Sequence, residues 1–320
     1  MKTIGVVTTG GDAPGMNAAI RAVTRIASAK NLQVIGFNRG WEGLLTNTYK
    51  KLTPRSVGGI IQLGGTMLHT IRCPEFKKEE CLEKAAQNLA ADNVDGLVVI
   101  GGDGSFKGAL ELSRKTRTLM VGIPASIDND IYGTEETIGF DTAINTAVGE
   151  IDKIRDTAIS HERLFIVEVM GRERGFLALQ VGISIGAEVV LIPEQVTQLD
   201  QILQVIQDNA RKGKRSGIIV AAEGVGDNTQ LAKDLQKHTN LEVRLSIIGY
   251  AQRGGNPTAR SRLLASQFAE KAVELLCEEE GNCVVGLQKN VIGSLELAQA
   301  CCNKKPVDLK LLELAKMLAI

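Results

Sequence analysis

The stretch VVTTGGDAPGMNAAIRAV, residues 6–23, joins an apolar, β-branched run to a glycine-rich turn and then to an amphipathic segment. This order predicts a buried strand, a tight turn and a helix that begins near Met16. Gly10, Gly11 and Gly15 would let backbone N–H groups approach an anion closely, and the helix N-terminus adds partial positive charge. The stretch therefore predicts an anion-binding turn, although the glycines alone fit a plain strand-to-helix turn equally well.

The same alternation of strand and helix patterns continues along the chain. Apolar runs that indicate strands occur at residues 3–9, 32–38, 96–100, 119–123, 163–169, 189–192, 217–222 and 244–249. Helical patterns occupy residues 16–30, 82–91, 141–157, 199–212 and 260–279. Continuous apolar strands separated by helices predict parallel sheets covered on both faces, so the fold class is α/β. Such units could instead close into a barrel, but irregular spacing and glycine clusters favour open sheets.

Composition narrows the class of protein. The chain has 320 residues, 44% of them hydrophobic, and its 37 basic residues balance 37 acidic ones. No overall charge therefore recruits nucleic acid or an anionic membrane. The N-terminal residues become polar too soon for a signal peptide, and no apolar run approaches the ~20 residues that span a bilayer. The six cysteines lack zinc-ligand spacing, which predicts reduced thiols. Together these features predict a soluble, cytoplasmic protein.

A second strand ends in a closely similar turn. IGGDGS, residues 100–105, again places glycines and an aspartate, Asp103, after an apolar run. One carboxylate can hold Mg²⁺, since this ion takes its other ligands from substrate phosphates and water. Neither turn has Walker A or dinucleotide-binding spacing, which argues against P-loop ATPases and common dehydrogenases. We expect the two strand ends to flank one phosphorylated ligand.

PASIDND, residues 124–130, follows the next strand along the chain. It brings Ser126, Asp128 and Asp130 to the edge at which open α/β sheets bind ligands. A carboxylate beside a sugar hydroxyl can remove the proton while the oxygen attacks phosphorus. An Asx turn that caps the helix near Asp141 is the structural alternative. Because three strand ends carry such residues, we favour Asp128 as a general base.

Arginines near other strands indicate a phosphorylated substrate, because a planar guanidinium binds phosphate through paired hydrogen bonds. Arg172 follows the strand at 163–169, Arg163 begins it, and Arg253 lies in the segment YAQRGG. Each arginine alone fits an exposed surface position. The basic segment NARKGKRSG, residues 209–217, either caps a helix or binds a second anion.

The chain resembles the family of bacterial ATP-dependent 6-phosphofructokinases. The resemblance is carried by TTGGDAPGMNAAIR, IGGDGS, PASIDND, TIGFDTA, VEVMGR and QRGG, which occur in order between Ile4 and about Gly286. It implies two Rossmann-like lobes, each a mainly parallel sheet with helices on both faces. The ATP-binding lobe would comprise residues 1–139 and 255–305, and the fructose-6-phosphate-binding lobe residues 140–254 and 306–320. The implied reaction transfers the γ-phosphoryl group of ATP to the 1-hydroxyl of fructose 6-phosphate, a committed and allosterically controlled step of glycolysis.

The resemblance also implies roles for individual residues. The ATP contacts would be Gly11, Arg72, Cys73, Gly102, Asp103, Gly104 and Ser105, with Asp103 holding Mg²⁺. The catalytic residues would be Asp128 as general base, Arg172, Ser126 and Asp130. The fructose 6-phosphate contacts would be Ser126, Ile127, Asp128, Arg163, Met170, Gly171, Arg172, Glu223, Arg244, Tyr250 and Arg253.

Assembly and regulation follow from the same resemblance. Arg163 and Arg244 would come from a neighbouring subunit of a homotetramer, so that each active site is shared. An effector, ADP or phosphoenolpyruvate, would bind Arg21, Arg25, Arg155, Glu188, Lys212 and Lys214.

Two positions bear on the phosphoryl donor. The pyrophosphate-dependent branch carries aspartate where Gly104 stands and lysine where Ala125 stands, and these side chains fill the space of the ATP α-phosphate. The small residues here favour ATP, although ATP-dependent members usually have glycine and threonine in place of Ala125 and Ser126. A pyrophosphate-dependent enzyme and a non-catalytic nucleotide-binding sensor are the alternatives.

Other departures concern effector and substrate phosphates. Pro54 replaces a typical arginine, Gly59 an acidic residue and Ser216 a histidine, although Arg55 lies next to Pro54. We therefore expect weakened or altered effector control. Tyr250 stands where histidine is usual, which predicts a weaker grip on the 6-phosphate.

Overall fold

The computed structural model describes residues 1–319. The chain divides into two compact units. Unit 1 comprises Met1–Thr142 and Arg253–Lys305, and unit 2 comprises Ala143–Gln252 and Pro306–Ile320. Ile320, the end of the predicted second lobe, lies outside the described residues.

Unit 1 is built on a sheet with the strand order β11-β10-β5-β4-β1-β2-β3. The strands are β1 Thr3–Thr9, β2 Gln33–Phe37, β3 Tyr49–Leu52, β4 Gly96–Gly101, β5 Leu119–Pro124, β10 Cys283–Gln288 and β11 Val291–Glu296. Neighbours from β2 to β10 pair in parallel, whereas β3 and β11 pair antiparallel at the two edges. β4 is buried along its whole length, as expected for a central strand covered on both faces.

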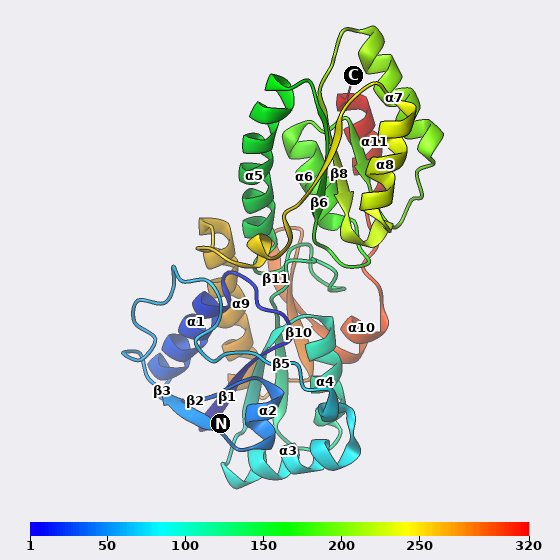
Figure 1. The fold of residues 1–320 in the computed structure, drawn as a ribbon. Helices are drawn as coiled ribbons and strands as arrows, with labels where there is room; N and C mark the ends of the chain where they lie inside the picture. The colour runs from blue at the N-terminus through cyan, green and yellow to red at the C-terminus, as the bar shows by residue number, and fades with distance from the viewer. Residues whose placement is uncertain (320) are drawn as a thin grey trace. The chain divides into compact units, whose positions relative to one another are not determined.

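Helices cover both faces of this sheet (Figure 1). α1 Met16–Ala29 and α9 Ala259–Cys277 pack against each other on one face. α3 Glu79–Ala91 and α4 Asp103–Ser113 cover the other face, together with the short helices α2 Trp41–Leu45, η1 Pro74–Lys77 and α10 Leu297–Cys302. The core on this second face includes Phe37, Leu97 and Phe106, which are almost completely buried.

Unit 2 has a smaller parallel sheet with the order β7-β8-β6-β9. Its elements are α5 Phe140–Ser160, which begins in unit 1, β6 Leu164–Val169, α6 Phe176–Ile185, β7 Val189–Leu191, α7 Leu199–Arg211, β8 Gly217–Ala222, η2 Glu223–Val225, α8 Asn228–His238, β9 Val243–Ile247, η3 Gly249–Arg253 and α11 Leu309–Leu318. Leu191 packs in the core with α7 and α8. A Cβ at Gly182 of α6 would touch Val190, which points to the opposite face of β7. Both faces of this sheet are therefore covered as well.

The two open sheets confirm the predicted α/β class with mainly parallel strands, and the barrel alternative was wrong. The predicted strands and helices occur, with ends shifted by at most a few residues. Three strands were not predicted. Polar residues interrupt the apolar pattern of the edge strands β3 and β11, whereas β10 is a buried apolar run inside the sheet that sequence reasoning missed. Among the described helices, none combines the length and the apolar character that crossing a membrane requires.

Candidate active site

The carboxyl ends of β1, β4 and β5 lie side by side at one edge of the unit 1 sheet. β4 pairs in parallel with β1 on one side and with β5 on the other. The register aligns Thr9 with Gly101, and Gly101 with Pro124. The three segments that the sequence predicts to bind ligands therefore begin at the same level of the sheet, at its ligand-binding edge.

The turn between β1 and α1 brings backbone and a guanidinium to one place. Gly10 has a φ of +87°, a left-handed conformation that glycine adopts without strain. Thr70 Oγ1 donates to the carbonyl of Gly10 over 2.8 Å. Arg253 Nη1 donates to the carbonyl of Asp12 over 3.1 Å, and a Cβ at Gly11 would lie 2.7 Å from the same nitrogen. A turn before a helix N-terminus with a cation beside it suits an anionic ligand.

The turn between β4 and α4 is tied to β1. Ser105 Oγ donates to the carbonyl of Thr9 over 2.9 Å in a buried hydrogen bond. A Cβ at Gly101 would lie 2.5 Å from that carbonyl oxygen, so only glycine fits there. A Cβ at Gly102 would lie 3.8 Å from the hydroxyl of Ser126, which places this turn beside the segment after β5. A Cβ at Gly104 would meet nothing within 4 Å.

Asp103, the predicted magnesium ligand, is the first residue of α4, and its side chain is 40% exposed. Its Oδ2 accepts a hydrogen bond from Lys107 Nζ, one turn later, over 2.6 Å. Within residues 1–319, no three His, Cys, Asp or Glu side chains converge on one metal position. An exposed carboxylate beside an anion-binding turn nevertheless fits Mg²⁺, since this ion takes most of its ligands from water and substrate phosphates.

The segment after β5 is fixed by its own backbone contacts. Ala125 N donates to the last carbonyl of β4 over 2.9 Å. Asp128 N donates to Ser126 Oγ over 3.2 Å, and Ile127 between them is fully buried in the core. Asp128 itself is only 2% exposed, while Asp130 is half-buried. The segment thus holds Asp128 in a defined position at the strand end, as a general base requires.

The predicted ATP contacts Arg72 and Cys73 line a cavity of about 580 Å³, together with residues of α2 and of the start of α3. Burial raises the pKa of the Cys73 thiol, which therefore stays protonated at neutral pH. Trp41, beside this cavity in α2, is 4% exposed and stacks on Phe76 with ring centroids 4.4 Å apart. Its indole is therefore part of the core of unit 1.

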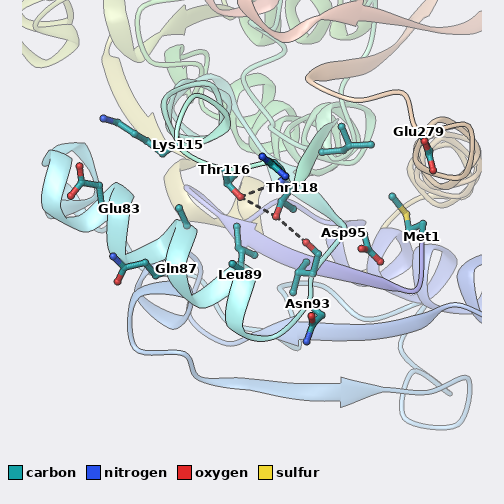
Figure 2. A pocket seen from close by; sticks show the side chains of 15 residues that line it. Met1, Glu83, Gln87, Leu89, Asn93, Asp95, Lys115, Thr116, Thr118 and Glu279 are labelled. Atoms are coloured by element: carbon teal, nitrogen blue, oxygen red, sulfur yellow. Dashed lines mark hydrogen bonds between the residues drawn. The ribbon is translucent and has the colours of Figure 1, made fainter.

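A larger cavity, of about 880 Å³, lies at the opposite edge of the same sheet (Figure 2). It is lined by Met1, Asp95 and Lys115, among others, and Thr118 Oγ1 donates to the carbonyl of Val94 over 2.9 Å at its floor. These residues precede β4 and β5, so the length of a six-residue strand, roughly 20 Å, separates them from the predicted site. Cavity size alone therefore does not identify the active site here.

In unit 2, the ends of β6 and β8 form a second cluster. Glu223 Oε1 accepts hydrogen bonds from Gly171 N over 3.1 Å and from Arg172 N over 2.6 Å. Gly171 has a φ of +134° and Arg172 a φ of +53°, so the carboxylate stabilises an unusual turn. Gln252 Oε1 accepts from Met170 N over 2.8 Å. Predicted sugar contacts from β6 and β8 are thus brought together.

Arg163 and Arg244 lie at the other end of the unit 2 sheet. Glu242 forms ion pairs with both, and its Oε2 accepts from Arg163 Nε over 2.6 Å. This hydrogen bond and the neighbouring charges lower the pKa of Glu242. Since β6 runs from Leu164 to Val169, roughly 20 Å separate this pair from Arg172 in the same chain. Tyr250 lies in η3 and is 83% exposed.

The predicted effector residues fall into two groups. In unit 2, Glu188 is buried, its Oε1 lies 2.5 Å from Lys214 Nζ, and Arg155 donates to the carbonyl of Ile185. Lys212 is the C-cap of α7, which agrees with the capping alternative for its segment. In unit 1, Arg21 and Arg25 lie one turn apart on α1. Arg25 Nη2 approaches the carbonyl of Pro54 to 3.5 Å.

Comparison with known proteins decides the family. A phosphofructokinase family model matches residues 3–276. The chain belongs to the phosphofructokinase family. An ATP-dependent 6-phosphofructokinase of Lysinibacillus sphaericus is 50% identical over 320 residues, which is the whole of both chains. The resemblance to ATP-dependent phosphofructokinases that the motifs indicate is thereby confirmed.

Solved phosphofructokinases share the fold. That of Pichia pastoris, solved in the T-state, is 35% identical with a TM-score of 0.88, and the match covers 94% of this chain and 35% of that longer one. A pyrophosphate-dependent phosphofructokinase of Marinobacter aquaeolei has a TM-score of 0.86, with 97% of this chain and 86% of that chain covered. Its identity is only 20%, so this likeness shows the fold alone.

Sequence reasoning missed two side chains in this phosphofructokinase. Gln252 fixes the turn after β6, and its place as the first residue of the QRGG motif was the signal that could have identified it. Lys107 pairs with Asp103, and the spacing of four residues in a helix was the signal that could have identified it.

Proposed function

We propose that this chain transfers the γ-phosphoryl group of ATP to the 1-hydroxyl of fructose 6-phosphate, giving fructose 1,6-bisphosphate and ADP. The proposal is carried by the 50% identity to an ATP-dependent 6-phosphofructokinase over the whole of both chains. The open space at Gly104 and the small side chain of Ala125 support ATP as the donor. The chain is thus a kinase of glycolysis.

In this proposal, unit 1 binds the nucleotide. The phosphates lie on the turns after β1 and β4, where Gly11 and the segment 102–105 offer backbone N–H groups. Arg72 and Cys73 contact the rest of the nucleotide. Asp103 would hold Mg²⁺, which supplies positive charge to the phosphates when bound.

The acceptor hydroxyl would be activated by Asp128. Its carboxylate accepts the proton of the 1-hydroxyl while the oxygen forms a bond to the γ-phosphorus and the bond to ADP breaks. Arg172 stabilises the charge on the moving phosphoryl group, and Ser126 and Asp130 position it. Positioning and electrostatics supply most of the catalysis in such a transfer, and a base adds roughly 10²–10⁴ in rate.

The sugar contacts would come from unit 2. Glu223, Met170 and Gly171 bind the sugar, supported by the hydrogen bonds that hold the turn after β6. Tyr250 and Arg253 bind the 6-phosphate together with Arg163 and Arg244 of a neighbouring subunit in a homotetramer. The separation of Arg163 from Arg172 along β6, roughly 20 Å, supports supply from another subunit.

Effector control would be weak. Pro54 presents only a carbonyl to Arg25 where a typical member presents a further guanidinium. An inhibitor that loses a charge contact in one conformational state loses its preference for that state. It then no longer shifts the equilibrium between the two states. Velocity curves at low fructose 6-phosphate, with and without phosphoenolpyruvate, test this, and strong inhibition would refute it.

A coupled assay of fructose 1,6-bisphosphate formation tests the proposed reaction. Purified protein is given fructose 6-phosphate with either MgATP or magnesium pyrophosphate as donor. We expect turnover with ATP and only background with pyrophosphate. Turnover with pyrophosphate but not with ATP would mean that pyrophosphate is the donor. Absence of product with both donors would refute the proposal.

A further inference from the structure

A lysine outside all the roles described above lies at the start of α4. Lys107 Nζ donates to Asp103 Oδ2 over 2.6 Å, and its side chain is 57% exposed. This ammonium therefore lies beside the carboxylate to which the proposed function assigns magnesium.

The contact between Lys107 and Asp103 is easily exchanged. Solvent-exposed pairs spaced by four residues on a helix contribute little to stability, because water screens them and ordering the side chains costs entropy. The lysine stem is flexible and its ammonium binds anions as a point charge from many directions. Lys107 can therefore leave Asp103 without disturbing the fold of α4.

The charges around Asp103 indicate which groups the Lys107 ammonium can bind after it leaves this carboxylate. Asp103, Asp128 and Asp130 follow two adjacent strands, and a nucleoside triphosphate brings further negative charge to the same edge of the sheet. Once Mg²⁺ occupies Asp103, the dication and the ammonium repel each other at that carboxylate. The phosphate oxygens that arrive with the ion then offer Lys107 a new anionic partner, and lysine is a common phosphate ligand.

We propose that Lys107 pairs with Asp103 in the empty enzyme and binds the β-phosphate of the magnesium-bound nucleotide when Asp103 takes the metal. The proposal rests on the proposed function for the position of the nucleotide. It adds a phosphate-binding residue that acts on ATP and on the product ADP alike, but not on a nucleoside monophosphate.

The test compares nucleotide affinities of three variants by isothermal titration calorimetry, in the absence of sugar phosphate. Lys107→Met removes the charge and keeps the length of the side chain, and Lys107→Arg keeps the charge. Arg114→Met is the matched control, since Arg114, the C-cap of the same helix, pairs with Glu111 over 2.8 Å. Each variant is titrated with MgATP, MgADP and AMP.

We expect Lys107→Met to bind MgATP and MgADP roughly 10- to 100-fold more weakly, as for loss of a hydrogen bond to a charged group. Its affinity for AMP should stay within about twofold of the wild type, and Lys107→Arg should recover most of the loss. Arg114→Met should bind all three nucleotides like the wild type. In steady state, the KM for ATP should rise in Lys107→Met while kcat changes less than about threefold.

Two results would overturn the inference. Binding of MgATP by Lys107→Met within about twofold of the wild type would mean that the ammonium does not contact the nucleotide. An equal loss for AMP would mean that the substitution distorts the pocket. A wild type that binds MgADP but forms no fructose 1,6-bisphosphate refutes the proposed reaction and leaves this inference standing, whereas a wild type that binds no nucleotide refutes both.

Discussion

Replacement of Gly104 by aspartate should abolish the use of ATP without disturbing the fold. Because a Cβ at Gly104 would meet nothing within 4 Å, the new side chain has room in the folded protein. Gly104 is the second residue of α4, where an acidic side chain gains about 0.3–1 kcal/mol from the helix dipole, and removal of a helical glycine adds a few tenths. Repulsion from Asp103 offsets part of this gain.

The expected change in the free energy of unfolding of Gly104→Asp is therefore about 0 to +1 kcal/mol, which raises Tm by up to about 4 °C. The activity should behave differently. The carboxylate would face the α-phosphate, and close juxtaposition of like charges costs several kcal/mol, so kcat/KM for MgATP should fall by at least about 100-fold.

The measurement combines thermal unfolding with the coupled assay for fructose 1,6-bisphosphate. Gly101→Ala is the matched control, because its Cβ would lie 2.5 Å from the carbonyl oxygen of Thr9 and should destabilise the fold by about 1–3 kcal/mol. If Gly104→Asp kept the wild-type Tm and also kept kcat/KM for MgATP, the nucleotide would not pass over α4. A large fall in Tm would contradict the open space at Gly104.

Four further predictions concern other parts of the chain. Glu223→Ala leaves two backbone N–H groups without their acceptor, so we expect the free energy of unfolding from chemical denaturation to fall by about 1–3 kcal/mol. An unchanged denaturation midpoint would mean that water replaces the carboxylate. Pro54→Arg should lower the phosphoenolpyruvate concentration for half-inhibition by about tenfold in velocity curves, and no change would exclude this position from effector control. Burial raises the pKa of Cys283 and of Cys301 to about 11, so at pH 8 iodoacetamide should modify the exposed Cys302 well before either, as read by mass spectrometry. Equal alkylation of all thiols would contradict the burial of Cys283 and Cys301. Because these two folded-state pKa values lie above the ordinary value of 9.0, the free energy of unfolding should also fall as pH rises from about 9 to about 11.

The α/β class could be predicted because the central strands are buried on both faces. β1 and β4 read as uninterrupted apolar runs, and glycine turns mark where each gives way to a helix. β3 and β11 could not be predicted in the same way. They lie at the sheet edges and expose polar residues, so neither a continuous apolar run nor a clean alternation marks them.

The candidate site was predictable where each residue directly follows a strand. Asp103 and Asp128 belong to that class, since parallel register brings adjacent strand ends together. Contacts between segments far apart in the sequence were not predictable. Arg253, predicted at the sugar 6-phosphate, donates to the carbonyl of Asp12, 241 residues away, and no local pattern encodes that contact. Lys107 was missed because its importance depends on what Asp103 binds.

The account depends most on Asp128 as the base that deprotonates the sugar hydroxyl. The most direct test is kcat for fructose 1,6-bisphosphate formation by Asp128→Asn, measured beside its dissociation constant for MgATP. We predict a fall in kcat of roughly 10²–10⁴-fold with MgATP affinity changed by less than about threefold. A kcat within about tenfold of the wild type would show that Asp128 does not accept the proton, and would contradict the proposed mechanism.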